Sequence, residues 1–203
     1  MNLSVSISHS VKITNSKIYF DGELYLHEES NLDAFLITAY KSLAITYPKF
    51  YKMDSMSKLG FIASELLMKN NLETEHDDYK KGLIIQNHSS SLETDKKYQA
   101  SIQDIASPAL FVYTLPNIVL GEMAIRHKFK GENTFFITEK FNAFELIRYT
   151  QILFDQHILC TAIIGYIEIL DNEVDVFLSL IELKDNNKLL TVKNLEDLYS
   201  SQL

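Results

Sequence analysis

The stretch Thr134-Phe135-Phe136-Ile137 is a short apolar strand, and a helical segment over about 141–155 separates it from a second apolar run, Cys160-Thr161-Ala162-Ile163-Ile164-Gly165-Tyr166-Ile167. A further helical segment over about 115–128 precedes the first strand, so that helices and strands alternate along this part of the chain. Such alternation is typical of a layered fold in which helices cover the faces of a sheet. We therefore expect an α/β protein.

The same periodicities predict the elements on either side of this region. Strands over about 3–20 lead to the turn signal Asp21-Gly22, which indicates a hairpin. The other elements that we expect are helices over about 31–45 and 55–69, a buried strand at 82–85, a polar loop over 88–97, a strand at 174–181 and a short helix around Leu195. We divide the chain into N-terminal strands and a helix (1–50), a central domain (50–184) and a C-terminal tail (185–203).

The composition excludes several classes of function. With 27 acidic and 19 basic residues the formal net charge is −8, so the protein should repel phosphate backbones, and we expect no nucleic-acid partner. Cys160 is the only cysteine, which excludes a disulfide within the chain and fits a reducing compartment. The six histidines lack metal-ligand spacing, so neither a metal nor a cofactor is expected. Because no apolar run is long enough to span a bilayer, we expect a cytoplasmic protein that does not associate with membranes.

Residues 107–131 read SPALFVYTLPNIVLGEMAIRHKFKG. This segment resembles the β-ketoacyl synthases, the thiolase-fold condensing enzymes of fatty-acid and polyketide synthesis, whose pattern there is S-P-x-x-F-x-x-x-x-P-N-x-x-x-G-x-x-A-I followed by a Gly that opens the next strand. The matching positions are Ser107, Pro108, Phe111, Pro116, Asn117, Gly121, Ala124, Ile125 and Gly131. Weaker similarities at Lys52-Met53-Asp54, at 82–85 and at 162–168 extend the likeness over about 50–170. The resemblance implies one thiolase-like half, with a mixed five-stranded sheet and helices on both of its faces.

The position of the family's nucleophile differs in this chain. In the active enzymes a Cys lies at the start of a buried helix, where the helix dipole favours the thiolate. Counting from Gly131, Lys140 takes that place, and a protonated amine there cannot attack an acyl thioester. We expect Lys140 to fill or block a vestigial site, with Glu139 as a candidate partner. The alternatives are a buried lysine that acts as a Schiff-base or general-base group, or an alignment that is offset by a residue or two.

The resemblance covers only the first of the two repeated halves that the active enzymes contain. The two His, or His and Asn, that stabilise the enolate and oxyanion lie in the second half, so we expect no catalytic triad and no enzymatic activity from this chain alone. A sheet whose helices on one face normally pack against the second half should leave apolar surface exposed, which favours association with a partner.

Other residues allow both a functional and a structural interpretation. The resemblance places Phe135, Phe136, Phe141 and Phe144 near a subunit interface and an acyl tunnel, although core packing explains them equally well. The basic cluster of 126–130 could contact an acyl carrier protein, but basic residues at a solvated helix end are the simpler explanation. Cys160 is expected to be a small buried apolar residue, and the loop 88–91 lacks the glycines of a phosphate-binding loop.

These observations give three functional hypotheses. The first is a non-catalytic subunit, similar to the chain length factors, that forms a heterodimer with a full-length ketosynthase and reaches the acyl carrier protein through that partner. The second is a stand-alone homodimer with a structural or acyl-binding role. The third, a condensing enzyme with an unusual nucleophile, is the least favoured because Lys140 is unsuited to thioester exchange.

Overall fold

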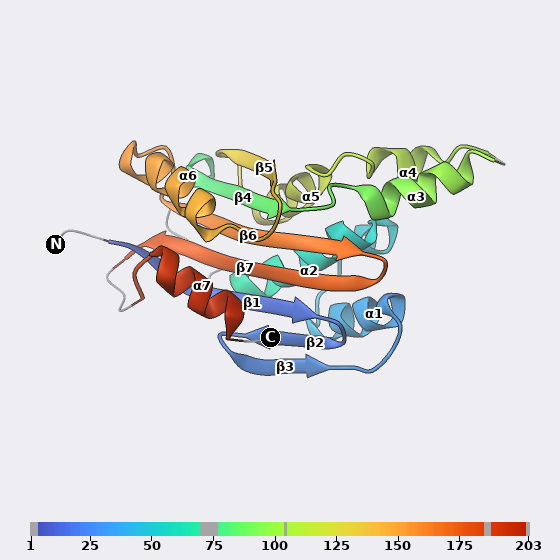
Figure 1. Cartoon of the computed structure of the whole chain (residues 1–203), viewed down its shortest axis with the longest axis horizontal. Helices are drawn as coiled ribbons and strands as arrows, with labels where there is room; N and C mark the ends of the chain where they lie inside the picture. Colours follow the sequence, from blue (N-terminus) through green and yellow to red (C-terminus); the bar gives the residue numbers. More distant parts are fainter. Residues whose placement is uncertain (1–3, 70–76, 104, 185–187, 202–203) are drawn as a thin grey trace.

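A computed structural model describes residues 4–69, 77–103, 105–184 and 188–201 of the protein, and shows one sheet with helices on both faces (Figure 1). The strands are β1 (Val5–Thr14), β2 (Lys17–Phe20), β3 (Glu23–His27), β4 (Lys81–Asn87), β5 (Asn133–Ile137), β6 (Thr161–Leu170) and β7 (Glu173–Leu183). The α-helices are α1 (Leu32–Ser42), α2 (Ser55–Met68), α3 (Leu92–Ser101), α4 (Pro108–Val112), α5 (Ile118–His127), α6 (Ala143–Asp155) and α7 (Val192–Ser200). Two short 3-10 helices span Pro48–Lys52 and Asp78–Lys80. The predicted α/β class is confirmed.

The sheet is mixed and has the strand order β3-β2-β1-β7-β6-β4-β5. Strand β4 pairs in parallel with β5 and β6, whereas the other pairings are antiparallel. Seven strands are present instead of the expected five, because β2 and β3 extend the sheet beyond β1. The turn between β2 and β3 lies at the predicted Asp21-Gly22, where both residues have positive φ (50° and 89°), as a tight hairpin requires. A register shift between Ile18 and Tyr19 interrupts the pairing of β2 with β3.

Two apolar layers hold the helices on the sheet. Helices α1, α2 and α5 cover one face and α6 and α7 the other, and Figure 1 shows α6 and α7 in front of the sheet. Helix α2 is buried along almost its whole length, and the Asp54 side chain caps it by accepting a hydrogen bond from the Ser57 amide at 2.9 Å. None of the helices in the described part of the chain has the length and apolar character that crossing a bilayer would require.

The C-terminal residues belong to the packed structure. Leu190 and Leu195 are buried in the same layer as Ile7 and Ile181, and the Leu190 amide donates to the Val5 carbonyl at 2.9 Å. Helix α7 therefore covers part of one face of the sheet within the same chain.

The predicted polar loop over 88–97 is also wrong in its second part, because α3 begins at Leu92. This helix has no apolar stripe that periodicity could detect. Its first turn is acidic, which suits a helix N-terminus, and the hydroxyl of Thr94 donates to Asp54 at 2.8 Å. A polar tertiary contact thus positions this helix.

Two glycines provide a matched test of this packing. At Gly165 φ is +153° and a Cβ atom would lie 1.9 Å from the Phe177 carbonyl oxygen, whereas a Cβ at Gly121 in α5 would meet nothing within 4 Å. We expect Gly165→Ala to lower the free energy of unfolding by at least about 3 kcal/mol, since the obstacle is backbone. Gly121→Ala should raise it by up to about 1 kcal/mol through helix propensity. Urea unfolding of both variants measures this, and equal effects would contradict the close β6–β7 approach.

Candidate functional site

Lys140, which the sequence resemblance assigns to the position of the nucleophile, lies in the connection from β5 to α6. Lys140 precedes the N-cap residue Asn142 by two positions. The Asn142 side chain accepts a hydrogen bond from the Glu145 amide at 3.1 Å, and its own amide donates to the side-chain oxygen of Gln86 at 3.1 Å. Gln86 is fully buried in β4, so the start of α6 is attached firmly to the sheet.

Lys140 itself is exposed. Within the described part of the chain its ammonium forms no hydrogen bond and no ion pair, and Glu139 does not approach it. A reactive lysine needs a desolvated environment, which this position does not supply. The role of Lys140 as a vestigial or blocking residue stays a prediction.

Aromatic side chains fill the space behind Lys140. Phe141 turns inward and stacks on Tyr199 of α7, with ring centroids 4.1 Å apart and planes at 21°. Phe177 and Tyr166 meet Phe141 edge-on, at 5.6 Å and 6.2 Å. The region beside the start of α6 is therefore occupied by a residue from the C-terminal helix.

A buried charge pair attaches this helix to the sheet. The Lys12 side chain is fully buried, and its Nζ lies 2.6 Å from Asp175 Oδ1 and 3.8 Å from the centre of the Tyr199 ring. The hydroxyl of Tyr199 donates to the other oxygen of Asp175. Burial lowers the pKa of Lys12, against the opposing effect of Asp175, and burial together with Asp175 raises the pKa of Tyr199. We call this Lys12–Asp175–Tyr199 group the α7 latch.

The loop after β4 also binds a carboxylate of the chain itself. The backbone amides of His88 and Ser89 donate to Glu168 at 2.6 Å and 3.0 Å, and the Ser89 hydroxyl donates to the same carboxylate. Groups that could have received a phosphate are thus already used by Glu168.

An open cleft of about 820 Å³ lies next to these groups, and five of the eleven residues that line it are acidic. The acidic residues that line it are Glu139, Glu168, Asp171, Glu173 and Asp175. Among the described residues no set of three or more His, Cys, Asp or Glu side chains is arranged to hold a metal ion. Cys160, the free thiol of the chain, is half-buried ahead of β6 and does not line this cleft. The cleft therefore offers negative charge but no evident nucleophile.

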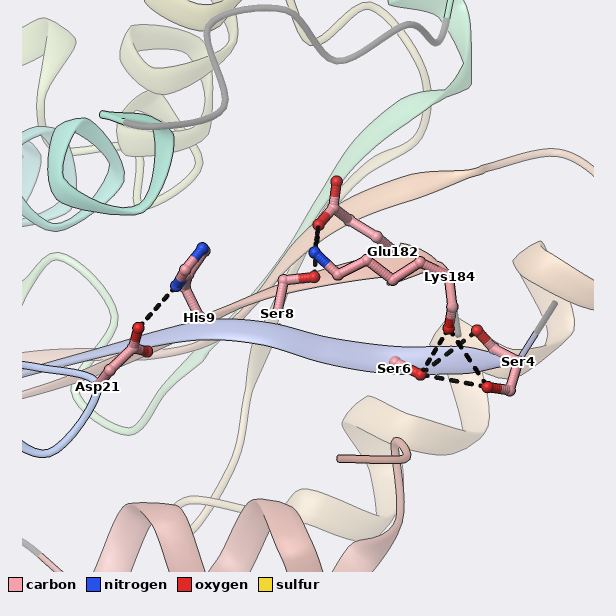
Figure 2. Close-up of polar contacts among 7 residues, drawn as sticks. All are labelled: Ser4, Ser6, Ser8, His9, Asp21, Glu182 and Lys184. Carbon is pink, nitrogen blue, oxygen red and sulfur yellow. Dashed lines mark hydrogen bonds and ion pairs between the residues drawn. The ribbon is translucent and has the colours of Figure 1, made fainter. Parts of the chain in front are cut away.

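A second polar cluster crosses β1 and β7 (Figure 2). His9 Nδ1 lies 2.6 Å from Asp21 Oδ2, but the Ser8 hydroxyl donates to Glu182 and not to His9, so a Ser–His–Asp relay is not formed. Burial opposes ionisation of Glu182, yet hydrogen bonds from Lys184 and Ser8 hold its pKa below the usual range. We interpret the cluster as a structural link between the strands.

The first part of the sequence motif forms the starts of two helices. The hydroxyl of Ser107 caps α4 by accepting a first-turn amide at 3.3 Å, and Pro108 takes the first helical position. Pro116 and Asn117 precede α5, and the Asn117 carbonyl accepts first-turn amides. These residues shape the chain without contacting Lys140.

The other residues of the motif lie partly in the core and partly on the surface. A Cβ at Gly131 would lie 2.7 Å from the Lys81 carbonyl oxygen, so a side chain cannot be accommodated there. Ala124 packs against the core, whereas Phe111 and Ile125 are 58% and 66% exposed. Phe111 still contacts the Tyr98 ring of α3, with centroids 5.5 Å apart, so that much of its surface but not all of it is left open.

The four candidate interface or tunnel residues differ in how far they are buried. Phe135 packs against the α2 layer, and Phe136 and Phe141 against the α6 layer. Phe144 is 61% exposed, so it is the member of this set that remains available to a partner.

Acidic neighbours neutralise most of the basic cluster at the end of α5. Arg126 forms two contacts with Glu65, and Lys130 lies 3.1 Å from Asp78. Burial lowers the pKa of His127 to about 4, so this side chain is neutral at physiological pH. The cluster offers little free charge for an acidic carrier protein.

The residues of the α7 latch were missed in the sequence. Lys12 alternates with Val11 and Ile13, a pattern that predicts a solvent-facing lysine when only one face of a strand is covered. Strand β1 lies inside the sheet and both of its faces are covered. No local signal connects Lys12 with Tyr199, because the contact depends on the position of the C-terminal helix.

Comparison with known proteins identifies the fold. No family model matches the chain and no curated protein matches it, but solved structures do. The ishigamide ketosynthase/chain length factor superposes with a TM-score of 0.62 at 15% identity, over 88% of this chain and 62% of that chain. A ketosynthase in complex with its chain length factor from Xenorhabdus doucetiae gives 0.61 at 11% identity, over 98% of this chain and 92% of that one. A type II polyketide synthase acyl-carrier protein in complex with its ketosynthase gives 0.59 at 14% identity, over 89% and 62%.

The fold is therefore the thiolase-like fold of ketosynthases and chain length factors, as the sequence resemblance implied. The chain spans about three-fifths of two of these structures and nearly the whole of the third.

The α7 latch can be tested by removing one charge. We expect Asp175→Asn to lower the free energy of unfolding by about 2 kcal/mol, because it leaves the buried Lys12 ammonium without its counter-ion. The loss is smaller than for a fully buried pair, since the Asp175 side chain is 32% exposed. The double variant Lys12→Met/Asp175→Asn should regain most of this loss. Since burial holds the pKa of Lys12 below its unfolded value, the unfolded chain binds the proton more tightly, and the deficit of Asp175→Asn should shrink as the pH rises toward about 10. Chemical denaturation at several pH values measures both effects, and a pH-independent deficit would speak against a charged Lys12.

Proposed function

We propose that this chain is a non-catalytic, ketosynthase-like subunit that pairs with a full-length ketosynthase in polyketide, polyene-pigment or fatty-acid synthesis, in the manner of a chain length factor. The fold supports this proposal, since two of the similar structures are named as ketosynthases with chain length factors. The single cysteine favours a cytoplasmic subunit, and Lys140 at the position that the resemblance assigns to the nucleophile favours a subunit whose partner performs the chemistry.

The observation that carries the proposal is the distribution of exposed apolar side chains. Most of them lie on α3 to α6 and their connections, in the upper part of Figure 1, where α5 and α6 lie next to the edge strand β5 and α3 and α4 extend past the end of the sheet. We call the exposed apolar residues on β5, α5 and α6 the β5-edge surface: Ile125, Ile137, Phe144 and Ile152. The other six, Leu92, Ile102, Ile105, Phe111, Val112 and Leu115, lie on α3, α4 and the connections next to them. Exposed apolar clusters of this kind mark interaction sites, and the outer side of β5 leaves backbone groups free for a further strand.

The shape of this surface suits a role as a subunit better than a role in catalysis. Tyr199 fills the region beside the start of α6, and Lys140 replaces the thiol that acyl transfer needs. The acyl carrier protein would be engaged by the partner, because Arg126 and Lys130 are already paired within this chain. A homodimer through the same surface is the alternative.

Co-expression tests the pairing. We expect the tagged chain to copurify in a one-to-one complex with a full-length ketosynthase encoded beside it, because burial of the β5-edge surface favours association. Size-exclusion chromatography with light scattering gives the stoichiometry. Ile137→Lys, which places a charge on β5, should reduce the recovered complex by at least about tenfold, a change worth about 1.4 kcal/mol.

Leu24→Lys is the matched control, because Leu24 has the same 55% exposed fraction as Ile137 but lies on β3, at the opposite edge of the sheet. It should leave the complex unchanged. A wild-type chain that stays monomeric or forms only homodimers with every candidate ketosynthase present would refute the heterodimer.

The absence of catalysis has a separate test. Incubation of the isolated chain with an acyl thioester should leave its intact mass unchanged, because Lys140 is an exposed, solvated amine and not a thiolate. The ketosynthase partner, treated identically, should gain the acyl mass. A stoichiometric acyl adduct on this chain that Lys140→Ala abolishes would establish the condensing-enzyme hypothesis instead.

A further inference from the structure

Helix α6 presents an exposed stripe in which one arginine lies between two apolar residues. Phe144, Arg148 and Ile152 follow at intervals of four residues, so they share one face of the helix. Phe144 and Ile152 are 61% and 44% exposed, and the opposite face of α6 packs on the sheet. This α6 stripe continues the β5-edge surface.

Two grooves run along the sides of the stripe. One, of about 390 Å³, has apolar walls from Phe136, Ile137 and Ile152. The other, of about 310 Å³, lies between α6 and the segment 190–192 and includes Phe144. Arg148 lines both grooves and therefore stands on the crest between them.

Arg148 has no counter-ion within the described part of the chain. Glu145 lies three residues earlier on the same helix, yet the two side chains form no ion pair. Arg126 differs in this respect, because Glu65 binds its guanidinium through two contacts. An unpaired guanidinium that a partner covers with apolar surface would lose its hydration without compensation, which is strongly unfavourable.

We propose that Arg148 is the polar anchor of the subunit interface and receives an Asp or Glu carboxylate from a different subunit, the full-length ketosynthase. This inference rests on the proposed function and specifies the partner further: an apolar surface with an acidic side chain opposite α6. A planar guanidinium can bind a carboxylate through two parallel hydrogen bonds, and Arg with aromatic and aliphatic neighbours is a frequent centre of binding energy.

The same arginine disfavours pairing with a second copy. Antiparallel pairing of two identical β5 edges has a twofold axis perpendicular to the sheet, so the α6 helices of both copies would lie on the same face and run in opposite directions. Arg148 lies near the middle of α6 and near the edge, so it would approach its own counterpart. Two like charges in an apolar contact repel, and a partner with a carboxylate avoids this cost.

Charge reversal tests the anchor. In the co-purified complex, Arg148→Glu should raise the dissociation constant by at least about tenfold, Arg148→Leu should raise it less, and Arg148→Lys should retain part of the affinity. Lys41→Glu, an equal change in net charge on an exposed residue of α1, is the control and should have no effect. Thermal unfolding of the isolated variants should match that of the wild type, because Arg148 is exposed and unpaired.

A double variant distinguishes a ketosynthase partner from a second copy of this chain. Glu145→Arg/Arg148→Glu keeps the composition and any self-complementarity between copies, but inverts the charge offered to a different subunit. We expect it to lose the heterodimer as Arg148→Glu does. A homodimer that is lost in Arg148→Glu and restored in the double variant would overturn the inference in favour of a Glu145–Arg148 contact between two copies.

The remaining outcomes distinguish the inference from the proposed function. If the heterodimer forms and Arg148→Glu binds with unchanged affinity, the anchor is refuted and the proposed function stands. If the wild-type chain binds no ketosynthase, both are refuted.

Discussion

The central strands of this sheet are buried on both sides, and the need to cover two faces with a short chain governs the rest of the structure. Helices α1, α2 and α5 cover one face. On the other, α6 alone does not extend over β1 and β7, and α7 completes the layer with Leu195 in the core and Tyr199 over Lys12. The buried Lys12–Asp175 pair is tolerated because the carboxylate, the ring and the partial exposure of Asp175 together compensate the desolvation of the ammonium.

This arrangement separates a closed face from an open edge. The aromatic contact between Phe141 and Tyr199 occupies the region that follows Lys140, beside the start of α6. Exposed apolar side chains remain on β5, α5 and α6, and on α3, α4 and their connections. Solved ketosynthase and chain length factor complexes share this fold. Under the proposed function, the chain contributes surface and shape to a ketosynthase partner.

Local patterns predicted the elements whose stability depends on apolar burial. The apolar runs in β4 and β6 predicted these strands, because parallel central strands contact helices on both sides. The apolar stripe of α2 and its Asp54 N-cap predicted that helix equally directly. Helix α3 was not predicted, because a hydrogen bond from Thr94 to Asp54, and not an apolar stripe that periodicity could detect, holds it in place. The buried Lys12 and the role of Tyr199 could not be read from spacing, since each depends on a partner far along the chain. Lys140 was found by its distance from Gly131, but no sequence pattern indicates that α7 fills the space behind it.

The two ends of the sheet are built differently. Strand β3 begins with the charged Glu23 and is joined to β2 through an irregular register, and both features hinder the addition of further strands to an edge. Strand β5 carries no such protection. A sheet that can grow from one side only stops after a single addition, so association through β5 yields a discrete pair and does not propagate into fibres.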